Sequence, residues 1–457
     1  MRCTLYAVRI FVTLSLLMRL ALLLVLSVVA QAQEDDFRVY TDHPRLFLKA
    51  TRLRLLKRER DRQSMRWMQF QTLIQGGAQM PEPGFAYALY HAITGDPDIG
   101  KKAIAYALGR TADIRQVAFV FDWCHDLLTP AQSKAIAARL VAAARQTSPK
   151  DIRDVRTRVL AAIAASDELG DRGEAVLRDV IERWWRKDTA PALLQGRDLN
   201  PGDQTFALIE LLHAVRDNLT IDLRASAGDY FRTFAQFYVS SHYPAPYPAA
   251  ENEYRIPMYT GDEPDLKSAA LSRVAGLAMV AYDTNAQENQ FLQGWLMQDR
   301  FLLRGTFGCP YEMMWANPYQ PGLSYFHLPL AFHDTRSGDL FIRSTWDEDA
   351  TWFGLYQGEA QVFRNGNITV LTLNKPSASQ SPKIPVGDTA TVVLGRSGAH
   401  FSGATPRVFV IGLKPARSYD VEVDDEEMAE NETDKAGTIE ILMPRDRETA
   451  VRIRERN

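Results

Sequence analysis

The chain has 457 residues, of which 46% are hydrophobic and 24% are charged. This is about three times the length of a usual single domain, and the composition is that of a folded globular protein, so a mainly disordered chain is excluded. Lys and Arg total 53 and Asp and Glu total 56, which gives a net charge of −3 and no basic excess of the kind that nucleic-acid binding requires. Three cysteines are too few for a disulfide scaffold.

The N-terminal segment has the pattern of a secretory signal peptide. Residues 20–30 form an apolar run after Arg19, and the A-x-A sequence at 30–32 provides a cleavage site. We therefore predict a signal peptide over 1–32, with Met18 as an alternative start, and a periplasmic or secreted location. An uncleaved membrane anchor is the alternative. No later stretch is long and apolar enough to cross a bilayer, so no other membrane contact is expected.

In the first two thirds of the chain, apolar residues recur at helical spacing. Predicted helices cover 50–63, 85–94, 99–109, 130–146, 151–166, 171–186, 203–217, 227–239 and 265–281. Thr129-Pro130 gives a clear helix start, since threonine is a good N-cap and proline suits the first helical position. The regular spacing favours antiparallel helix pairs, so we predict that residues 33–335 form an incomplete (α/α) helical toroid.

Two long segments of this part are rich in proline and aromatic residues. Prolines alternate with tyrosines in residues 240–264, which argues against a regular helix, and residues 305–329 have a similar composition. We predict that both are ordered loops. Loops of this length and composition often carry binding sites.

From about residue 338 the hydrophobic pattern changes to strict alternation, which is typical of β-strands. Predicted strands cover 339–344, 351–357, 360–364, 367–373, 390–394, 407–412, 418–423, 437–442 and 449–454. Asn365-Gly366 predicts a hairpin with a type I′ turn. We therefore predict that residues 336–457 form an antiparallel β-sandwich.

Three motifs in this order resemble those of the heparinase II/III-like polysaccharide lyases. Residues 43–48 (HPRLFL) are similar to the entry segment of that family, and residues 121–129 (FDWCHDLLT) are similar to one of its helix connections. Residues 343–346 (RSTW) and 350–353 (ATWF) are similar to its opening sandwich strands. The resemblance covers residues 43–375. It implies a toroid followed by a sandwich, β-elimination on a uronate-containing polysaccharide, and an acidic polysaccharide or oligosaccharide as the partner.

Elimination removes the C5 proton of a uronate, next to the carboxylate of the same sugar. That carboxylate must be neutralised, usually by Asn, Arg or His, while Tyr or His residues take the C5 proton and protonate the leaving oxygen. The 240–264 segment contains these residue types. Catalytic roles are predicted for His242, Tyr243, Asn252, Tyr254 and Arg255. Asn252 or Arg255 would neutralise the carboxylate, and Tyr254 or His242 would act as the base.

Further residues are predicted to bind substrate. They are Glu251, Tyr259, Gln204, Asn317, Tyr319, Tyr325 and His327. The alternative for the first segment is loop packing and a structural network of ion pairs. The alternative for residues 317–327 is a hinge that seats the sandwich on the helices.

The sequence departs from the family pattern at one point. The family has a His-bearing strand after the R-S-x-W segment, whereas residues 361–367 contain no histidine. A non-catalytic glycan-binding protein on the same fold is therefore one alternative. A glycoside hydrolase on the helical toroid, with Asp203 and Glu251 as the carboxylate pair, is another.

Several other kinds of site are not expected. The sequence lacks the H-x-x-x-H, H-E-x-x-H and C-x-x-C spacings of metal sites, a glycine-rich phosphate loop and a G-x-S-x-G elbow. We therefore predict no metal and no cofactor. Cys124 and Cys309, which remain after signal cleavage, either pair in an oxidising compartment or stay as buried free thiols. The sequence predicts no particular oligomeric state.

Overall fold

The computed structural model describes residues 35–146, 151–197, 199, 202–248, 253–298, 303–373, 381–403, 405–425, 427–444 and 448–456. Residues 39–457 form one compact unit, within which all contacts given below lie. The predicted signal peptide at 1–32 lies outside the described residues. None of the helices in the described ranges has both the length and the apolar character that a membrane span requires.

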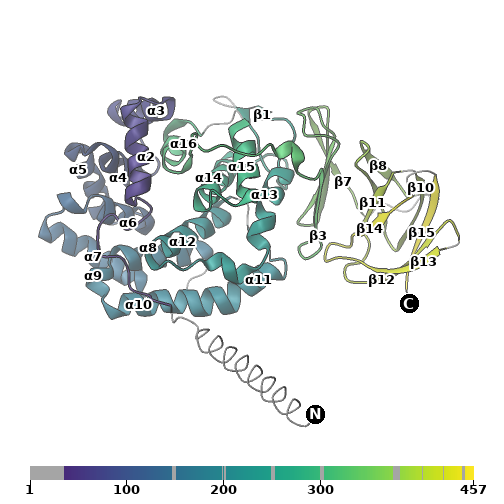
Figure 1. Cartoon of the computed structure of the whole chain (residues 1–457), viewed down its shortest axis with the longest axis horizontal. Helices are drawn as coiled ribbons and strands as arrows, with labels where there is room; N and C mark the ends of the chain where they lie inside the picture. Colours follow the sequence, from purple (N-terminus) through teal and green to yellow (C-terminus); the bar gives the residue numbers. More distant parts are fainter. Residues whose placement is uncertain are drawn as a thin grey trace, which may run out of the picture. The chain divides into compact units, whose positions relative to one another are not determined.

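Helices make up the first part of this unit (Figure 1). They are α2 (Ala50–Asp61), α3 (Met65–Gln75), α4 (Pro83–Thr94), α5 (Pro97–Leu108), α6 (Ile114–Trp123), η1 (His125–Leu127), α7 (Pro130–Ala144), α8 (Ile152–Ala164), α9 (Ser166–Leu169), α10 (Asp171–Arg178), η2 (Asp179–Thr189), α11 (Ala190–Leu194), α12 (Asp203–Leu219), η3 (Leu223–Ala227), α13 (Tyr230–Ser241), α14 (Leu266–Tyr282), α15 (Gln287–Gln298), α16 (Gly305–Trp315) and η4 (Tyr325–His327). The predicted start at Thr129 is confirmed, because its side chain accepts from the amide of Gln132 in a capping box. The helix-rich first part is confirmed as well.

Six of these helices contact one another in a closed ring. Each helix contacts the next in the order α4, α6, α8, α12, α14 and α16, and α16 contacts α4. Ring helices are buried around most of their circumference: in α6, every residue from Arg115 to Trp123 is buried. The helices predicted from the sequence did not include α6.

The predicted loop over 305–329 is wrong in its first half, where α16 forms despite Pro310 inside it. Tertiary contacts outweigh the unfavourable local sequence. Every residue from Gly308 to Trp315 is buried, and the guanidinium of Arg66 donates to the carbonyls of Glu312 and Ala316 at the end of the helix. Pro310 is the sixth residue of α16, so it removes one amide donor from the helix.

Strands make up the second part. They are β3 (Ala331–Asp334), β4 (Asp339–Arg343), β5 (Trp352–Tyr356), β6 (Glu359–Arg364), β7 (Asn367–Leu371), β8 (Lys383–Val386), β9 (Ala390–Leu394), β10 (Gly398–Gly403), β11 (Arg407–Ile411), β12 (Ser418–Val423), β13 (Glu427–Glu432), β14 (Ile439–Leu442) and β15 (Thr449–Glu455). The first sheet has the order β3-β4-β5-β6-β7 and begins before the predicted domain boundary at 335/336. The second sheet has the order β14-β11-β9-β8, and the third has the order β10-β15-β12-β13. Neighbouring strands are antiparallel except for β9 and β11, which are parallel.

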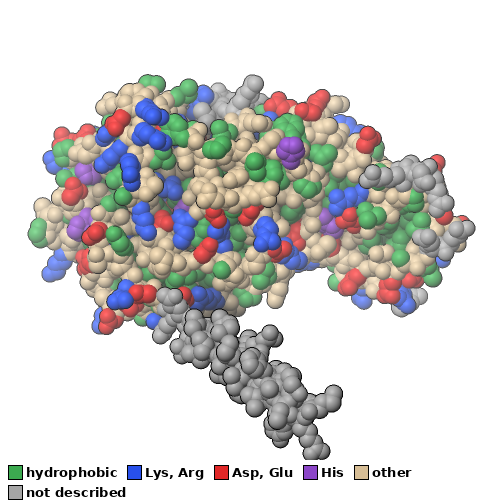
Figure 2. All heavy atoms as spheres, viewed as in Figure 1, with side chains coloured by type: hydrophobic (Ala, Val, Ile, Leu, Met, Phe, Trp, Pro, Cys, Tyr) green, Lys and Arg blue, Asp and Glu red, His purple; other side chains and the backbone are tan. Residues whose placement is uncertain are grey.

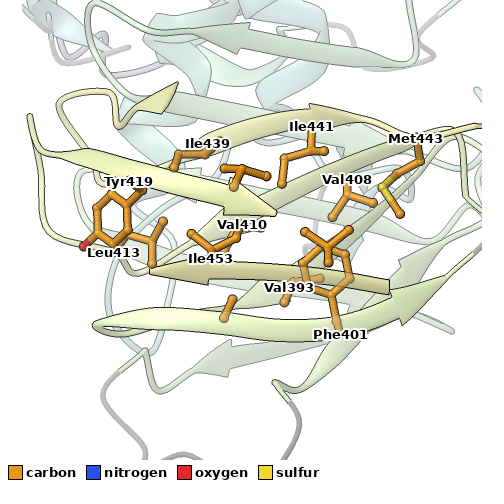
Figure 3. Close-up of a cluster of buried hydrophobic side chains, with 13 residues drawn as sticks. Val393, Phe401, Val408, Val410, Leu413, Tyr419, Ile439, Ile441, Met443 and Ile453 are labelled. Carbon is orange, nitrogen blue, oxygen red and sulfur yellow. The ribbon is translucent and has the colours of Figure 1, made fainter. Parts of the chain in front are cut away.

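The sheets pack face to face, consistent with the predicted sandwich but with three layers. Alternate residues of the second sheet enter two cores: Val392 and Phe409 face the first sheet, whereas Val393 and Val408 face the third. Figure 3 shows the core between the second and third sheets. A sheet buried on both faces reads as a continuous apolar run, as the sequence of β9 does. The predicted type I′ turn is confirmed, since Asn365 and Gly366 both have positive φ between β6 and β7.

The first sheet docks on the helical part through its other face. Phe341 and Trp352 pack with Tyr243 of the 240–264 segment. The guanidinium of Arg343 donates to the carbonyl of His242, and the indole of Trp352 donates to the carbonyl of Ser240 at 2.9 Å. Arg343 of the 343–346 segment and Trp352 of the 350–353 segment thus bind the carbonyl end of α13, where a helix leaves acceptors unpaired.

The first two family-like motifs contact each other. The carboxylate of Asp122 lies 2.6 Å from Nδ1 of His43 and accepts from the backbone amides of Arg45 and Leu46. The indole of Trp123 donates to the carbonyl of Leu46 at 2.9 Å. These contacts give both motifs a structural role in joining the chain entry to α6.

Candidate functional site

The amino-terminal turns of the six ring helices surround one cavity of about 310 Å³, which we call the mouth. It is lined by Glu82, Asp113, Arg115, Arg153, Arg156, Asp203, Phe206, Asp265, Lys267, Ser268, Leu271, Phe307 and Tyr311. Amino ends of helices carry partial positive charge and outward-facing amides, which favour anionic ligands. Aromatic rings beside charged groups make the mouth suitable for a polar ligand with apolar faces, such as a sugar.

A repeated tripeptide places three basic side chains at the mouth. Three ring helices begin with an N-cap aspartate, then Ile or Leu, then Arg or Lys. The tripeptides are Asp113-Ile114-Arg115, Asp151-Ile152-Arg153 and Asp265-Leu266-Lys267. Each aspartate accepts from first-turn amides, so the helix starts there and the basic residue follows two positions later. This repeat is the sequence signal from which these residues could have been found.

A buried network of charges forms the floor of the mouth. The guanidinium of Arg115 lies 2.6 Å from Glu210 and 3.3 Å from Glu82, and Arg156 lies 3.0 Å from the other oxygen of Glu210. The side chains of Arg115 and Glu210 are 4% and 1% exposed. Burial disfavours the charged guanidinium, but the neighbouring carboxylates outweigh it and raise the pKa of Arg115 well above its ordinary value. Arg115 therefore keeps its positive charge although it is buried.

Tyr311 belongs to the same buried network: it lines the mouth and is 2% exposed. Its hydroxyl donates to Glu82 at 2.5 Å. Burial raises the pKa of Tyr311 well above its ordinary value, and the negative charges of Glu82 and Glu210 add to this while Arg115 opposes it. Tyr311 therefore holds its proton at neutral pH and can act as a hydrogen-bond or proton donor.

The basic side chains at the rim differ in how they are paired. Arg153 lies 2.6 Å from Asp203 and 2.5 Å from Asp151, so its charge is compensated. Lys267 is exposed and forms no ion pair with any residue that the structure describes. Among the described lining residues, Lys267 is therefore the cation best able to meet an incoming carboxylate.

A second cavity of about 290 Å³ continues from the mouth, and we call it the side branch. The two share Asp265 and Ser268. The side branch is lined further by the 256–260 segment and by Tyr356 and Gln357 at the turn between β5 and β6. Mouth and side branch together form one cleft that runs from the helix ring to the first sheet.

Among the predicted site residues that the structure describes, Tyr259 lines this cleft. Its backbone carbonyl accepts from the amide of Gln361 at 2.8 Å, and Gln361 also accepts from the hydroxyl of Tyr243. Gln361 lies in β6, the strand in which the family pattern expects a histidine. The amide therefore ties the 240–264 segment to the first sheet.

His242 and Tyr243 are both 2% exposed and face the protein interior. Nδ1 of His242 lies 2.6 Å from the carbonyl of Tyr238, and burial lowers the pKa of His242 to about 3. The hydroxyl of Tyr243 donates to Gln361 at 2.6 Å, and burial raises the pKa of Tyr243. Arg255 is paired with Glu348 at 2.8 Å. The contacts of His242, Tyr243 and Arg255 are thus those expected if this segment packs as a loop and forms ion pairs, which was the alternative to a catalytic role.

The remaining residues of that segment are less fully described. Glu251 and Asn252 lie outside the described residues. Tyr254 is described by its backbone, which pairs with Tyr247 between β2 (Glu253–Tyr254) and β1 (Tyr247–Pro248). The 240–264 segment is therefore a hairpin whose two arms pair again at His242 and Pro257.

The other predicted substrate-binding residues do not converge on the cleft. Gln204 lies in the first turn of α12 next to Asp203. Tyr325 is buried against Trp346, and His327 is exposed in η4. Asn317 lines a different cavity at the carboxyl ends of ring helices, and Tyr319 lies under Arg58 near it. The described residues contain no group of three His, Cys, Asp or Glu side chains that could hold a metal ion.

Comparison with known proteins gives only distant likenesses. No family model and no curated protein matches the chain. The structure of heparan sulfate lyase HepC from Pedobacter heparinus is similar with a TM-score of 0.34 and 12% identity, over 81% of this chain and 75% of that one. A mutant of the same lyase gives 0.35 and 11%, over 81% and 75%, and a structure titled glycoside hydrolase gives 0.30 and 9%, over 82% and 71%.

Proposed function

We propose that the cleft binds an acidic glycan and that the protein cleaves this glycan by β-elimination. The observation that carries the proposal is the ion-pair network of Arg115, Glu210, Arg156 and Glu82 under the mouth. Burying several charges costs free energy that packing alone does not require, and such networks in clefts are typical of functional sites. In this proposal the ring helices are the inner layer of an (α/α) toroid, and the protein is exported.

Roles can be assigned to the described groups of the cleft. Lys267 meets the carboxylate of the uronate and stabilises the negative charge that builds up when C5 loses its proton. Tyr311, which keeps its proton, donates to the glycosidic oxygen as the bond between that oxygen and C4 breaks. Tyr254, in the hairpin beside the side branch, remains the predicted acceptor of the C5 proton.

The reaction is tested by incubating the full chain with a panel of uronate-containing polymers. Elimination produces an unsaturated uronate that absorbs in the ultraviolet, together with one new reducing end per cleavage. Tyr311→Phe should reduce kcat by roughly 10²-fold or more, the usual contribution of a proton donor. Lys267→Gln should raise KM, whereas Lys134→Gln on the exposed face of α7 should change neither. Unchanged kinetics in both cleft variants, or no unsaturated product from any polymer, would contradict elimination in this cleft.

A glycoside hydrolase is the second candidate, because four carboxylates line the same mouth: Glu82, Asp113, Asp203 and Asp265. Asp203 was predicted as one of the hydrolytic pair, and Glu251 lies outside the described residues. Hydrolysis would give reducing ends without ultraviolet absorption, and Asp203→Asn would abolish them. Binding of the polymer without any new reducing end would identify a non-catalytic glycan-binding protein.

A further inference from the structure

A third cavity, which we call the basic cavity, lies at the other end of the helix ring. It has a volume of about 580 Å³ and is lined by Phe47, Lys49, Thr51, Arg52, Arg54, Leu55, Arg58, Arg216, Asp217, Ala281, Thr284, Trp315, Ala316 and Asn317. These residues belong to the start of α2 and to the carboxyl ends of α12, α14 and α16. The 17 residues of α12 separate this basic cavity from the mouth by roughly 25 Å.

Two of the basic side chains that line this cavity, Arg52 and Arg216, bind backbone carbonyls at helix ends. Arg52 donates to the carbonyl of Met314 at 3.0 Å, and the guanidinium of Arg216 donates to the carbonyl of Tyr282. Both therefore satisfy acceptors at helix carboxyl ends, where cations are favourable. Asp217, the single acidic residue among those that line the cavity, is paired with Arg216 at 2.9 Å.

The other basic side chains have no such partner. Within the described residues, Lys49, Arg54 and Arg58 form no ion pair, and the guanidinium of Arg58 lies 4.5 Å from the ring centre of Tyr319. Arg54 and Arg58 stand four residues apart on the same face of α2, an arrangement of like charges that destabilises a helix. Figure 2 shows Lys and Arg side chains gathered over α2. A cavity lined by these like charges favours an anionic ligand.

The shape and walls of the cavity limit what that anion can be. Its volume falls in the range of about 300–1,000 Å³ in which proteins hold small ligands, so a nucleic-acid duplex does not fit inside it. Phe47, Leu55 and Trp315 add apolar wall beside the cations. A ligand that carries several acidic groups on apolar-faced rings matches both properties.

We propose that the basic cavity is a second binding site for an acidic oligosaccharide, contacted by Lys49, Arg54 and Arg58. The identification of the ligand as a saccharide rests on the proposed function, whereas the existence of an anion site rests on the cavity itself. A polymer chain held at this end would keep the protein on its substrate while the mouth acts on another segment.

The test is binding of a fluorescently labelled, heparin-derived hexasaccharide to the full chain, followed by anisotropy. The double variant Arg54→Gln/Arg58→Gln should weaken this binding by about ten- to hundredfold, because two charged contacts are lost. The matched control is Arg110→Gln/Arg172→Gln, which removes the same charge from two exposed arginines elsewhere and should bind as the unchanged chain does. All four residues are exposed, so each variant should fold.

Two further measurements separate this proposal from the function of the mouth. Lys267→Gln should leave the arginine-dependent binding intact, and the double variant should keep the turnover of short substrates. If the hexasaccharide does not bind, or binds the double variant and its control equally, the basic cavity is not a glycan site, even if the mouth cleaves glycans. If a nucleoside triphosphate displaces the hexasaccharide at much lower concentration than an unlabelled hexasaccharide does, the saccharide assignment is wrong. Arginine-dependent binding without any cleavage would support the basic cavity and contradict the proposed lyase activity.

Discussion

Nη2 of Arg115 lies 2.6 Å from Oε1 of Glu210, and this pair joins the second residue of α6 to the middle of α12. Glu210 also binds Arg156 of α8 through its other oxygen at 3.0 Å. One carboxylate therefore holds three ring helices together under the mouth.

Replacing Glu210 by Gln should destabilise the protein strongly. The change leaves two buried guanidinium groups without their shared counter-charge, and breaking a buried pair in this way costs about 3–5 kcal/mol. The free energy of unfolding in urea measures it. The control is Glu182→Gln, which breaks an exposed pair with Arg178 at 3.4 Å and should cost at most about 1 kcal/mol. Equal effects of the two changes would contradict a structural role for the network.

The contact between His333 and two acids makes the packing of the first and second sheets depend on pH. His333 in β3 lies 2.9 Å from Asp434 and 3.7 Å from Glu440, which is itself paired with Arg407 at 2.6 Å. Burial disfavours the imidazolium, but the hydrogen bonds to the two carboxylates outweigh it and raise the pKa of His333 to about 9 from an ordinary 6.5. Protonated His333 therefore stabilises the folded state below pH 6.5, and this contribution is lost as the pH rises through 9.

The measurement is the free energy of unfolding as a function of pH for the unchanged chain and for His333→Asn. Their difference should shrink by on the order of 3 kcal/mol across this window. His327→Asn, a change at an exposed histidine, should leave the pH dependence as it is. A difference that stays constant with pH would show that His333 is not charged in the folded protein.

Arg343→Met should loosen the joint between the helices and the first sheet. The guanidinium donates to the carbonyls of Val239 and His242 at the end of α13, and each buried acceptor left without a donor costs about 1–3 kcal/mol. Urea unfolding monitored by tryptophan fluorescence reports the loss, since Trp352 lies at this joint. Arg364→Met removes an exposed arginine and should change stability by less than about 0.5 kcal/mol. A comparable loss in both variants would contradict a specific joint.

Cys124 and Cys309 should resist alkylation in the folded protein. Both are buried free thiols, and burial raises the pKa of each to about 12, so little reactive thiolate forms at mildly alkaline pH. Mass spectrometry after treatment with iodoacetamide should find both unmodified in buffer and both modified in urea. Labelling of either residue under native conditions, or a disulfide between them, would contradict this arrangement.

The elements predicted well are those whose cause is local. The capping box at Thr129 and the Asn365-Gly366 turn depend on side chains within a few residues. In β12 and β15 the alternation of apolar residues reflects burial of one strand face. Two of the helices that were missed, α6 and α16, depend on distant partners. α16 forms around Pro310 because other helices bury it and Arg66 binds its end.

The sequence by itself therefore determined the order of the parts, with helices first and sheets after, and most of the strands. It also showed that residues 240–264 do not form a regular helix. It could not determine the site. Residues of α6, α12, α14 and α16 meet at the mouth because these helices close into a ring, a consequence of packing among segments far apart in the chain. The same packing buried His242 and Tyr243, whose composition alone had predicted a catalytic role, and left Lys267 at the rim. Local patterns encode secondary structure, whereas burial and proximity arise only once the chain has folded on itself.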